Sequence, residues 1–272
     1  MPELPEVETV RLSLVEKLTG RKITAVTVHY PRMVELHSVE EFKRSVTGKT
    51  IQRLERRGKY LLLRLSEDLV LALHLRMTGQ LTVQPMKQPV ADATYFILRL
   101  DNDTELRFRD QRKFGKVFTF SANTLPTALA KMGPEPLADE FTLDMLRKRF
   151  TGRKLAVKKA LLNQEIIAGI GNIYADEALF VAGIHPVRLV DSLTEPELEQ
   201  LHQAIRQVLQ EGIANRGTTK RDYLDGEGNP GTYQNMLRVY GRKGLPCPQC
   251  GAPVAKMNFG GRGTHFCPLC QK

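Results

Sequence analysis

The sequence predicts an α+β multidomain protein built from three successive parts. Short β-type segments dominate the first part, and helical periodicity follows after residue 138. All four cysteines lie together near the end, between Cys247 and Cys270. A chain of 272 residues is long enough for two domains with sizeable cores and one small module.

The opening stretch, MPELPEVETV, begins a predicted helix over residues 4–18, where leucine and valine recur at helical spacing. Proline is tolerated in a first turn and an acid suits the positive end of the helix dipole, so Pro2 and Glu3 fit a helix start. The same pair also allows chemistry. If Met1 is removed, Pro2 becomes a free secondary amine beside a carboxylic acid.

Short β-type segments without intervening helices make up the rest of the first part. Gly, Asn and Asp punctuate them, as in LDNDTEL, which favours a β-sandwich or barrel-like domain. The predicted strands cover residues 22–30, 59–65, 69–75, 94–100, 104–109 and 116–120.

The second part begins after a predicted linker, GPEPLA, at residues 133–138. Its clearest element is a long helix from about residue 195, because Thr194 and Glu197 form a capping box around Pro196 in the first turn. This helix is expected to end near Gly217. Residues 217–237 are rich in Gly, Asn and Asp, which predicts a mobile loop.

The charge balance favours a polyanionic partner, since 40 Lys and Arg against 30 Asp and Glu give a net charge of +10. No acid follows Glu227, which indicates a phosphate-facing surface at the end of the chain. The basic residues there are Arg238, Arg242, Lys243, Lys256, Arg262 and Lys272. No apolar run approaches the roughly 18 residues of a membrane span, and no signal peptide is evident, so a cytoplasmic location is expected.

The four cysteines have the spacing of a structural zinc site: Cys247 and Cys250, then sixteen residues, then Cys267 and Cys270. Four thiolates leave no open position for water, so the zinc ion is expected to stabilise the fold of this module and not to catalyse. The alternative is a redox-active or incidental set of thiols. The hairpin between the pairs carries Arg262 among glycines, and arginine suits phosphate.

Nine stretches together resemble the bacterial formamidopyrimidine-DNA glycosylase family, and they lie in the family's order along the chain. They are MPELPEVETV, RRGKYLL, HLRMTGQL, RDQRKFG, GPEPL, AGIGNIYADEALF, AGIHP, VYGRKG and the cysteine hairpin. The resemblance implies a monomeric bacterial enzyme, cytoplasmic and nucleoid-associated when bound, that acts on damaged double-stranded DNA. It implies removal of oxidised purines, 8-oxoguanine and formamidopyrimidines, followed by strand cleavage.

The resemblance also implies three domains. They are an N-terminal catalytic β-sandwich with its leading helix over residues 1–132, and a helix–two-turn–helix DNA-binding domain with linker and lesion-capping loop over residues 133–236. A zinc finger with one structural Zn²⁺ follows over residues 237–272. In this reading, DNA lies between the first two domains.

Catalytic roles follow from the same resemblance. The Pro2 nitrogen, freed of Met1, attacks the anomeric carbon and forms a Schiff base, and Glu3 protonates the sugar ring oxygen. Lys59 donates a proton in β-elimination, and Arg262 assists δ-elimination and grips phosphate. Its own surroundings in the sequence favour the alternative that Lys59 is a solvated lysine at a strand end.

DNA contacts are implied at several further positions. Base removal everts the nucleotide, and Met77, Arg112 and Phe114 match the side chains that fill the resulting gap, with Arg112 bonding the orphaned cytosine.

Phosphate contacts are expected from His74, Arg153, Lys158 and Asn172, the last at a helix start. Tyr95 lies near the place of a phosphate-binding histidine of the family, which leaves that contact open.

Two alternatives remain. The first is an endonuclease VIII-type glycosylase for oxidised pyrimidines. Such chains begin with a stretch similar to PEGPE and lack the Met, Arg and Phe set. The PELPE of this chain, with Arg112 and Phe114, therefore favours purines as substrates. A zinc-containing DNA-binding protein without catalysis predicts that Pro2 and Glu3 are replaceable.

Overall fold

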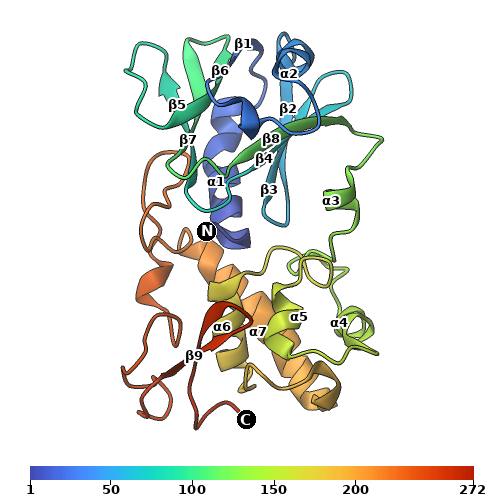
Figure 1. Ribbon diagram of the computed structural model, residues 1–272, viewed down its shortest axis with the longest axis vertical. Helices are drawn as coiled ribbons and strands as arrows, with labels where there is room; N and C mark the ends of the chain where they lie inside the picture. Colours follow the sequence, from blue (N-terminus) through green and yellow to red (C-terminus); the bar gives the residue numbers. More distant parts are fainter. The chain divides into compact units, whose positions relative to one another are not determined.

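The computed structural model describes residues 1–272 and divides into two compact units of a mixed α/β fold (Figure 1). Unit 1 contains Met1–Ala130 and Asn215–Thr232, and unit 2 contains Lys131–Ala214 and Tyr233–Lys272. The chain therefore returns to unit 1 for one segment after α7 (Glu195–Ala214). No helix is both long and apolar enough to span a membrane.

Unit 1 contains two four-stranded antiparallel sheets, with strand orders β1-β6-β7-β5 and β2-β3-β4-β8. Six of the eight strands match the predicted segments. The bounds are β1 Ile23–Val28, β2 Ile51–Arg57, β3 Tyr60–Leu65, β4 Leu69–His74, β5 Gly79–Pro85, β6 Thr94–Leu100, β7 Thr104–Asp110 and β8 Lys116–Ser121.

Helix α1 (Leu4–Leu18) joins the two sheets through one hydrophobic core. It packs against β2 and β3 of one sheet and against β5 of the other. Val7, Val10 and Leu14 are fully buried in that core, each stabilising the fold by roughly 1.5–3 kcal/mol of apolar burial. The structure thus confirms the predicted sandwich with its leading helix.

Among the longer elements of unit 1, three were not predicted: α2, β2 and β5. Helix α2 (Val39–Val46) is capped by Ser38, whose hydroxyl accepts from the Glu41 N–H. Strand β2 reads IQRLERR, in which two apolar residues stand among charged ones, so it shows no clear alternation. Strand β5 begins at a glycine and ends at a proline, which masks its strand character.

Unit 2 is mainly helical and ends in a β-hairpin. Its regular elements are α4 Leu143–Phe150, α5 Val157–Leu162, α6 Asn172–Val181, α7 Glu195–Ala214, β9 Ala255–Phe259 and β10 Arg262–Phe266. Short elements complete the chain: η1 Pro31–Met33 and α3 Thr127–Ala130 in unit 1, and η2 Val190–Ser192 and η3 Tyr233–Asn235 in unit 2. The nearly apolar α6 is central, packing against α5, α7 and β10.

Thr194 and Glu197 interact at the start of α7 as half of the predicted capping box. The Thr194 N–H and hydroxyl both donate to Glu197 Oε2, at 2.8 and 2.9 Å. Arg188 also pairs with this carboxylate, and its hydrogen bonds and charge help to lower the pKa of Glu197 to about 2. The helix ends at Ala214, slightly before the predicted end.

Candidate active site and nucleic-acid interface

The first residues of the chain are buried at the start of α1. Pro2 and Glu3 are both buried, whereas Met1 is exposed. The Glu3 N–H donates to Glu6 Oε2 at 2.8 Å, which fixes the backbone next to Pro2. Because Met1 precedes it in the sequence, the Pro2 nitrogen is a tertiary amide, and only loss of Met1 gives it a nucleophilic lone pair.

The second oxygen of Glu6 holds the segment 215–232. Glu6 Oε1 accepts from the Thr218 N–H at 2.7 Å, and the Tyr223 hydroxyl donates to the Glu6 carbonyl at 3.3 Å. A Cβ at Gly217 would lie only 2.8 Å from Glu6 Cγ, so this close approach requires glycine. Burial, with the charge of Glu6, raises the pKa of Tyr223, which stays a neutral donor. One carboxylate therefore joins the chain start to this segment.

Lys59 lies in the turn between β2 and β3 and is buried. His74, at the end of β4, faces Tyr60 across the sheet with ring centroids 4.5 Å apart. Its Nδ1 accepts from the Arg76 N–H at 3.0 Å. Burial lowers the pKa of His74 to about 3, and the charges of Arg76 and Lys59 act in the same direction. A neutral His74 can form hydrogen bonds but carries no positive charge.

Met77, Arg112 and Phe114 lie on two neighbouring turns of unit 1. Met77 precedes β5 and the other two follow β7, and these strands pair with Gly79 opposite Asp110. Because the two strands are antiparallel, the start of β5 and the end of β7 lie together, and both turns lie at the same end of this strand pair. The Met77 and Phe114 side chains are 38% and 48% exposed, and the Arg112 guanidinium lies 4.9 Å from the Phe114 ring centroid.

A cavity of about 450 Å³ opens beside these turns. Basic and aromatic side chains line most of it, a composition that suits phosphate and bases. The lining residues are Met1, Tyr30, Arg32, Arg76, Met77, Lys113, Phe114 and Lys116.

Tyr95 stands beside a cation. The Lys113 ammonium lies 5.1 Å from the Tyr95 ring centroid and 5.4 Å from that of Tyr30, and the two rings are 5.7 Å apart. Tyr95 therefore lies next to a basic group on unit 1, although it carries no charge of its own.

In unit 2, Lys158 is not placed for the expected phosphate contact. Its side chain is 0% exposed, as is that of Asp176, and the two form an ion pair at 2.5 Å. The ammonium also donates to Thr264 Oγ1 at 2.7 Å. This burial argues against direct contact with DNA, because the charge is already neutralised within the protein.

Asp176 holds the hairpin of β9 and β10 to α6, which lies beside it in Figure 1. Its Oδ2 accepts from the His265 N–H at 2.9 Å and lies 3.2 Å from His265 Nδ1. The Asn172 amide donates to the Gly263 carbonyl at 2.9 Å. These contacts lie directly beyond Arg262, which is exposed at the start of β10.

Two expected phosphate contacts of unit 2 are accessible. Arg153 is exposed, and its Nε donates to the Arg149 carbonyl at 2.8 Å. Asn172 is half-buried at the first position of α6, and the positive end of a helix dipole favours an anion.

The four cysteines form a cluster that fits one zinc ion. All four sulfur atoms lie within 4.8 Å of one another, with Cys247 and Cys270 at 3.9 Å and Cys250 and Cys267 at 3.5 Å. Tetrahedral zinc with Zn–S bonds of about 2.3 Å requires sulfur separations of about 3.8 Å. Since the ring of His265 faces Asp176, the ligand set is the four thiolates alone.

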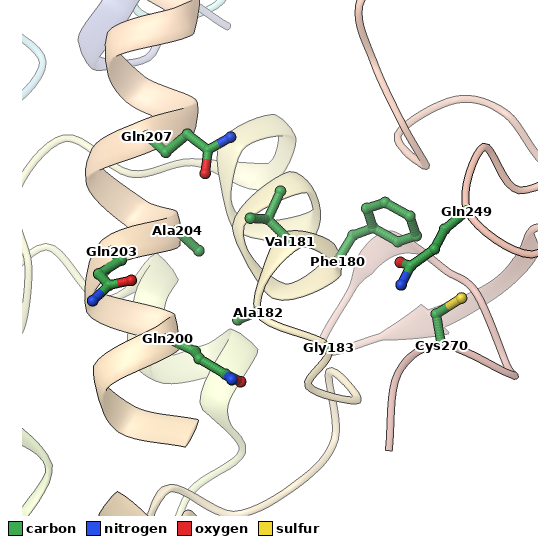
Figure 2. Close-up of a pocket in the computed structure, with 10 residues that line it drawn as sticks. All are labelled: Phe180, Val181, Ala182, Gly183, Gln200, Gln203, Ala204, Gln207, Gln249 and Cys270. Carbon is green, nitrogen blue, oxygen red and sulfur yellow. The ribbon is translucent and has the colours of Figure 1, made fainter. Parts of the chain in front are cut away.

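A second cavity, of about 310 Å³, lies in unit 2 between α7, the end of α6 and the zinc module (Figure 2). The amide side chains of Gln200, Gln207 and Gln249 point toward it, Gln203 also lines it, and Cys270 lies on one side. Its lining holds no ionisable pair suited to acid–base chemistry, so it is not a candidate catalytic site.

Three buried carboxylates organise these regions, and the sequence did not single them out: Glu6, Asp110 and Asp176. Asp176 carried a signal, since it stands in the mainly apolar stretch AGIGNIYADEALF. A charged side chain in such a stretch is buried only when it is paired.

Three family models match successive parts of the chain. The formamidopyrimidine-DNA glycosylase N-terminal domain matches residues 1–117, and the H2TH domain of the same family matches residues 132–223. A zinc finger found in FPG and IleRS matches residues 244–272.

Full-length relatives agree with these matches. The formamidopyrimidine-DNA glycosylase of Pelotomaculum thermopropionicum is 48% identical over 100% of this chain and 99% of its own. A Lactococcus lactis FPG variant in complex with Fapy-dG-containing DNA has a TM-score of 0.94 and 41% identity, covering 100% of both chains. Lactococcus lactis Fpg with abasic-site DNA has a TM-score of 0.93 and 41% identity, covering 99% of both. The chain belongs to the formamidopyrimidine-DNA glycosylase family.

Proposed function

We propose that this chain, once Met1 is removed, is a bifunctional DNA glycosylase and AP lyase of base excision repair that acts through a Schiff base at Pro2. The DNA glycosylase assignment rests on the family. The observation that carries the proposed chemistry is the buried start of the chain, where Glu6 fixes the backbone of Glu3 next to Pro2.

In the proposed reaction, the Pro2 nitrogen forms a bond to the sugar's anomeric carbon while the bond from that carbon to the base breaks. The base leaves with the electron pair of that bond and takes up a proton, and the Pro2 amine gives up its own proton. Glu3 supplies a proton to the ring oxygen, which opens the sugar and leaves an iminium on Pro2. The iminium withdraws electrons, so a proton leaves the neighbouring carbon and the 3′ phosphate departs. Lys59 and Arg262 serve the β- and δ-eliminations.

The proposed DNA contacts come from both units. Met77, Arg112 and Phe114 fill the gap left by the everted base, and exposure of their turns supports this role. The proposed phosphate contacts are made by Arg153, Asn172, Arg262 and Tyr95. His74, buried and neutral, contributes a hydrogen bond from its ring.

The proposed division of labour has three parts, with the catalytic sandwich in residues 1–132, the DNA-binding helices in 133–236 and the zinc finger in 237–272. The proposed lesion-capping loop is residues 217–237, and its part up to Thr232 belongs to unit 1. The protein acts as a cytoplasmic monomer on damaged double-stranded DNA.

The proposed substrates are oxidised purines, 8-oxoguanine and formamidopyrimidines. Solved complexes of the Lactococcus lactis relative with Fapy-dG-containing DNA support this class. Another complex of that relative holds DNA with an oxidised pyrimidine, which supports a site that also accepts such bases.

Borohydride trapping tests the proposal. Protein whose N-terminus is shown by intact mass to begin at Pro2 should be trapped on DNA with 8-oxoguanine opposite cytosine. Pro2→Gly should bind this DNA but lose most of the adduct, and the trapped fraction should follow the Met1-free fraction. An absent adduct with processed protein would refute the Schiff base, and unchanged trapping by Pro2→Gly would move the nucleophile elsewhere.

A further inference from the structure

A single buried carboxylate fastens both turns that carry Met77, Arg112 and Phe114. Asp110, the last residue of β7, is 0% exposed. Its Oδ1 accepts from the Thr78 hydroxyl at 2.5 Å and from the Arg112 N–H at 3.2 Å. Its Oδ2 accepts from the Gly115 N–H at 2.6 Å. The donors to this carboxylate that the structure shows come from the two turns.

The Thr78 hydroxyl connects the turns directly. It donates to Asp110 Oδ1 and accepts from the Arg112 N–H at 3.1 Å, so both of its functions are used. Thr78 follows Met77 in the chain, and the Arg112 N–H belongs to the other turn. The hydroxyl therefore fixes the position of one turn relative to the other.

The turns also fit tightly against the sheet beneath them. A Cβ at Gly115 would lie 2.6 Å from the Phe108 ring of β7, and a Cβ at Gly79 would lie equally close to it, at 2.6 Å. Each turn holds one non-glycine residue with positive φ, Arg76 at 54° and Lys113 at 59°. Such backbones persist only where surrounding contacts determine them, and the Asp110 hydrogen bonds are contacts of that kind.

We propose that Thr78 and Asp110 are positioning residues that hold the two turns as one preformed wedge, and that this wedge sets the preference for the base opposite the lesion. The proposal rests on the proposed function, in which Arg112 bonds the orphaned base. The Arg112 N–H is held by both Thr78 and Asp110, so the backbone from which the guanidinium extends toward the opposite strand has a fixed position. Without the Thr78 hydroxyl, that origin is free to shift and the geometric discrimination between cytosine and adenine weakens.

The test compares Thr78→Val, which removes the hydroxyl at nearly constant shape, with Thr78→Ser, which keeps it. Thr82→Val, the same change on β5 away from Asp110, is the matched control. The first measurement is affinity for duplexes with a tetrahydrofuran abasic site opposite cytosine or adenine. It needs no catalysis, so a failed trapping experiment leaves its result valid. The second is the rate of 8-oxoguanine excision opposite each base.

Thr78→Val should lower the cytosine-to-adenine ratio of affinities by roughly tenfold, as expected for the loss of a hydrogen bond to a charged group. Thr78→Ser and Thr82→Val should keep the wild-type ratio within about twofold. The proposal is overturned if Thr78→Val keeps the ratio, or if Thr78→Ser lowers it equally. An equal loss of affinity for both duplexes also overturns it, since that marks general destabilisation.

Discussion

Replacing Lys158 by methionine is expected to lower the free energy of unfolding by about 3–5 kcal/mol, without removing a DNA contact. The Lys158 and Asp176 side chains are both 0% exposed and pair at 2.5 Å. The variant leaves the Asp176 carboxylate buried with only the groups of His265 to hold it. An uncompensated buried charge of this kind accounts for the magnitude.

A second variant separates the charge from the shape. Lys158→Met combined with Asp176→Leu replaces the whole pair by apolar groups, which is often close to neutral. The backbone N–H of His265 then lacks its acceptor, at a cost of about 1–3 kcal/mol. The double variant should therefore be more stable than Lys158→Met alone.

The assay is thermal unfolding of the zinc-loaded full chain, followed by calorimetry and by release of zinc. The single variant should lower the transition of unit 2 by roughly 10 °C or more, and the double variant by less. Similar transitions for wild type and Lys158→Met would show that the pair contributes little to the fold.

The salt dependence of DNA binding decides whether Lys158 also touches phosphate. A phosphate-contacting residue reduces the salt slope by about one when it is neutralised, whereas a buried lysine leaves the slope unchanged. Arg153→Met, which changes an exposed residue, provides the comparison. A slope reduced by about one in a stable Lys158→Met protein would refute the reasoning from burial.

Two further predictions concern unit 1. The pKa of His74 is about 3 in the folded protein, against an ordinary value of 6.5. Between pH 3 and pH 6.5 the unfolded chain therefore binds one more proton than the folded protein. The free energy of unfolding then falls by about 1.4 kcal/mol for each unit by which the pH falls across this window. His74→Gln should flatten that part of the curve in urea titrations, and an unchanged slope would contradict a neutral His74. Gly217→Ala should reduce borohydride trapping because its Cβ would displace Glu6, whereas Gly228→Ala meets open space at a similar φ. Equal trapping by both variants would show that the position of Glu6 does not affect the Schiff-base reaction.

Local patterns predicted the elements whose signals are contained within a few residues. Helix α1 was predicted because its apolar side chains recur over a single stretch, and the start of α7 because Thr194 and Glu197 are three residues apart. Strand β2 was missed since its outer positions are charged and only its pairing with β3 makes it a strand.

The polar contacts that organise the candidate site join residues far apart in the chain, and no local pattern contains them. Glu6 meets Thr218, and Asp176 meets His265, only after the chain has folded. For Lys158 the charge was visible in the sequence, but its buried partner was not. The resemblance therefore suggested a phosphate contact for a lysine that is fully enclosed.

The placement of residues 215–232 in unit 1 has a consequence for synthesis on the ribosome. The N-terminal sandwich emerges first, together with the residues proposed to carry the reaction. The Thr218 N–H that binds Glu6 follows only after the helices of unit 2 through α7 have been translated. In a nascent or truncated chain that lacks this segment, the opening residues lack this contact. Assembly of the site therefore requires synthesis at least as far as this segment.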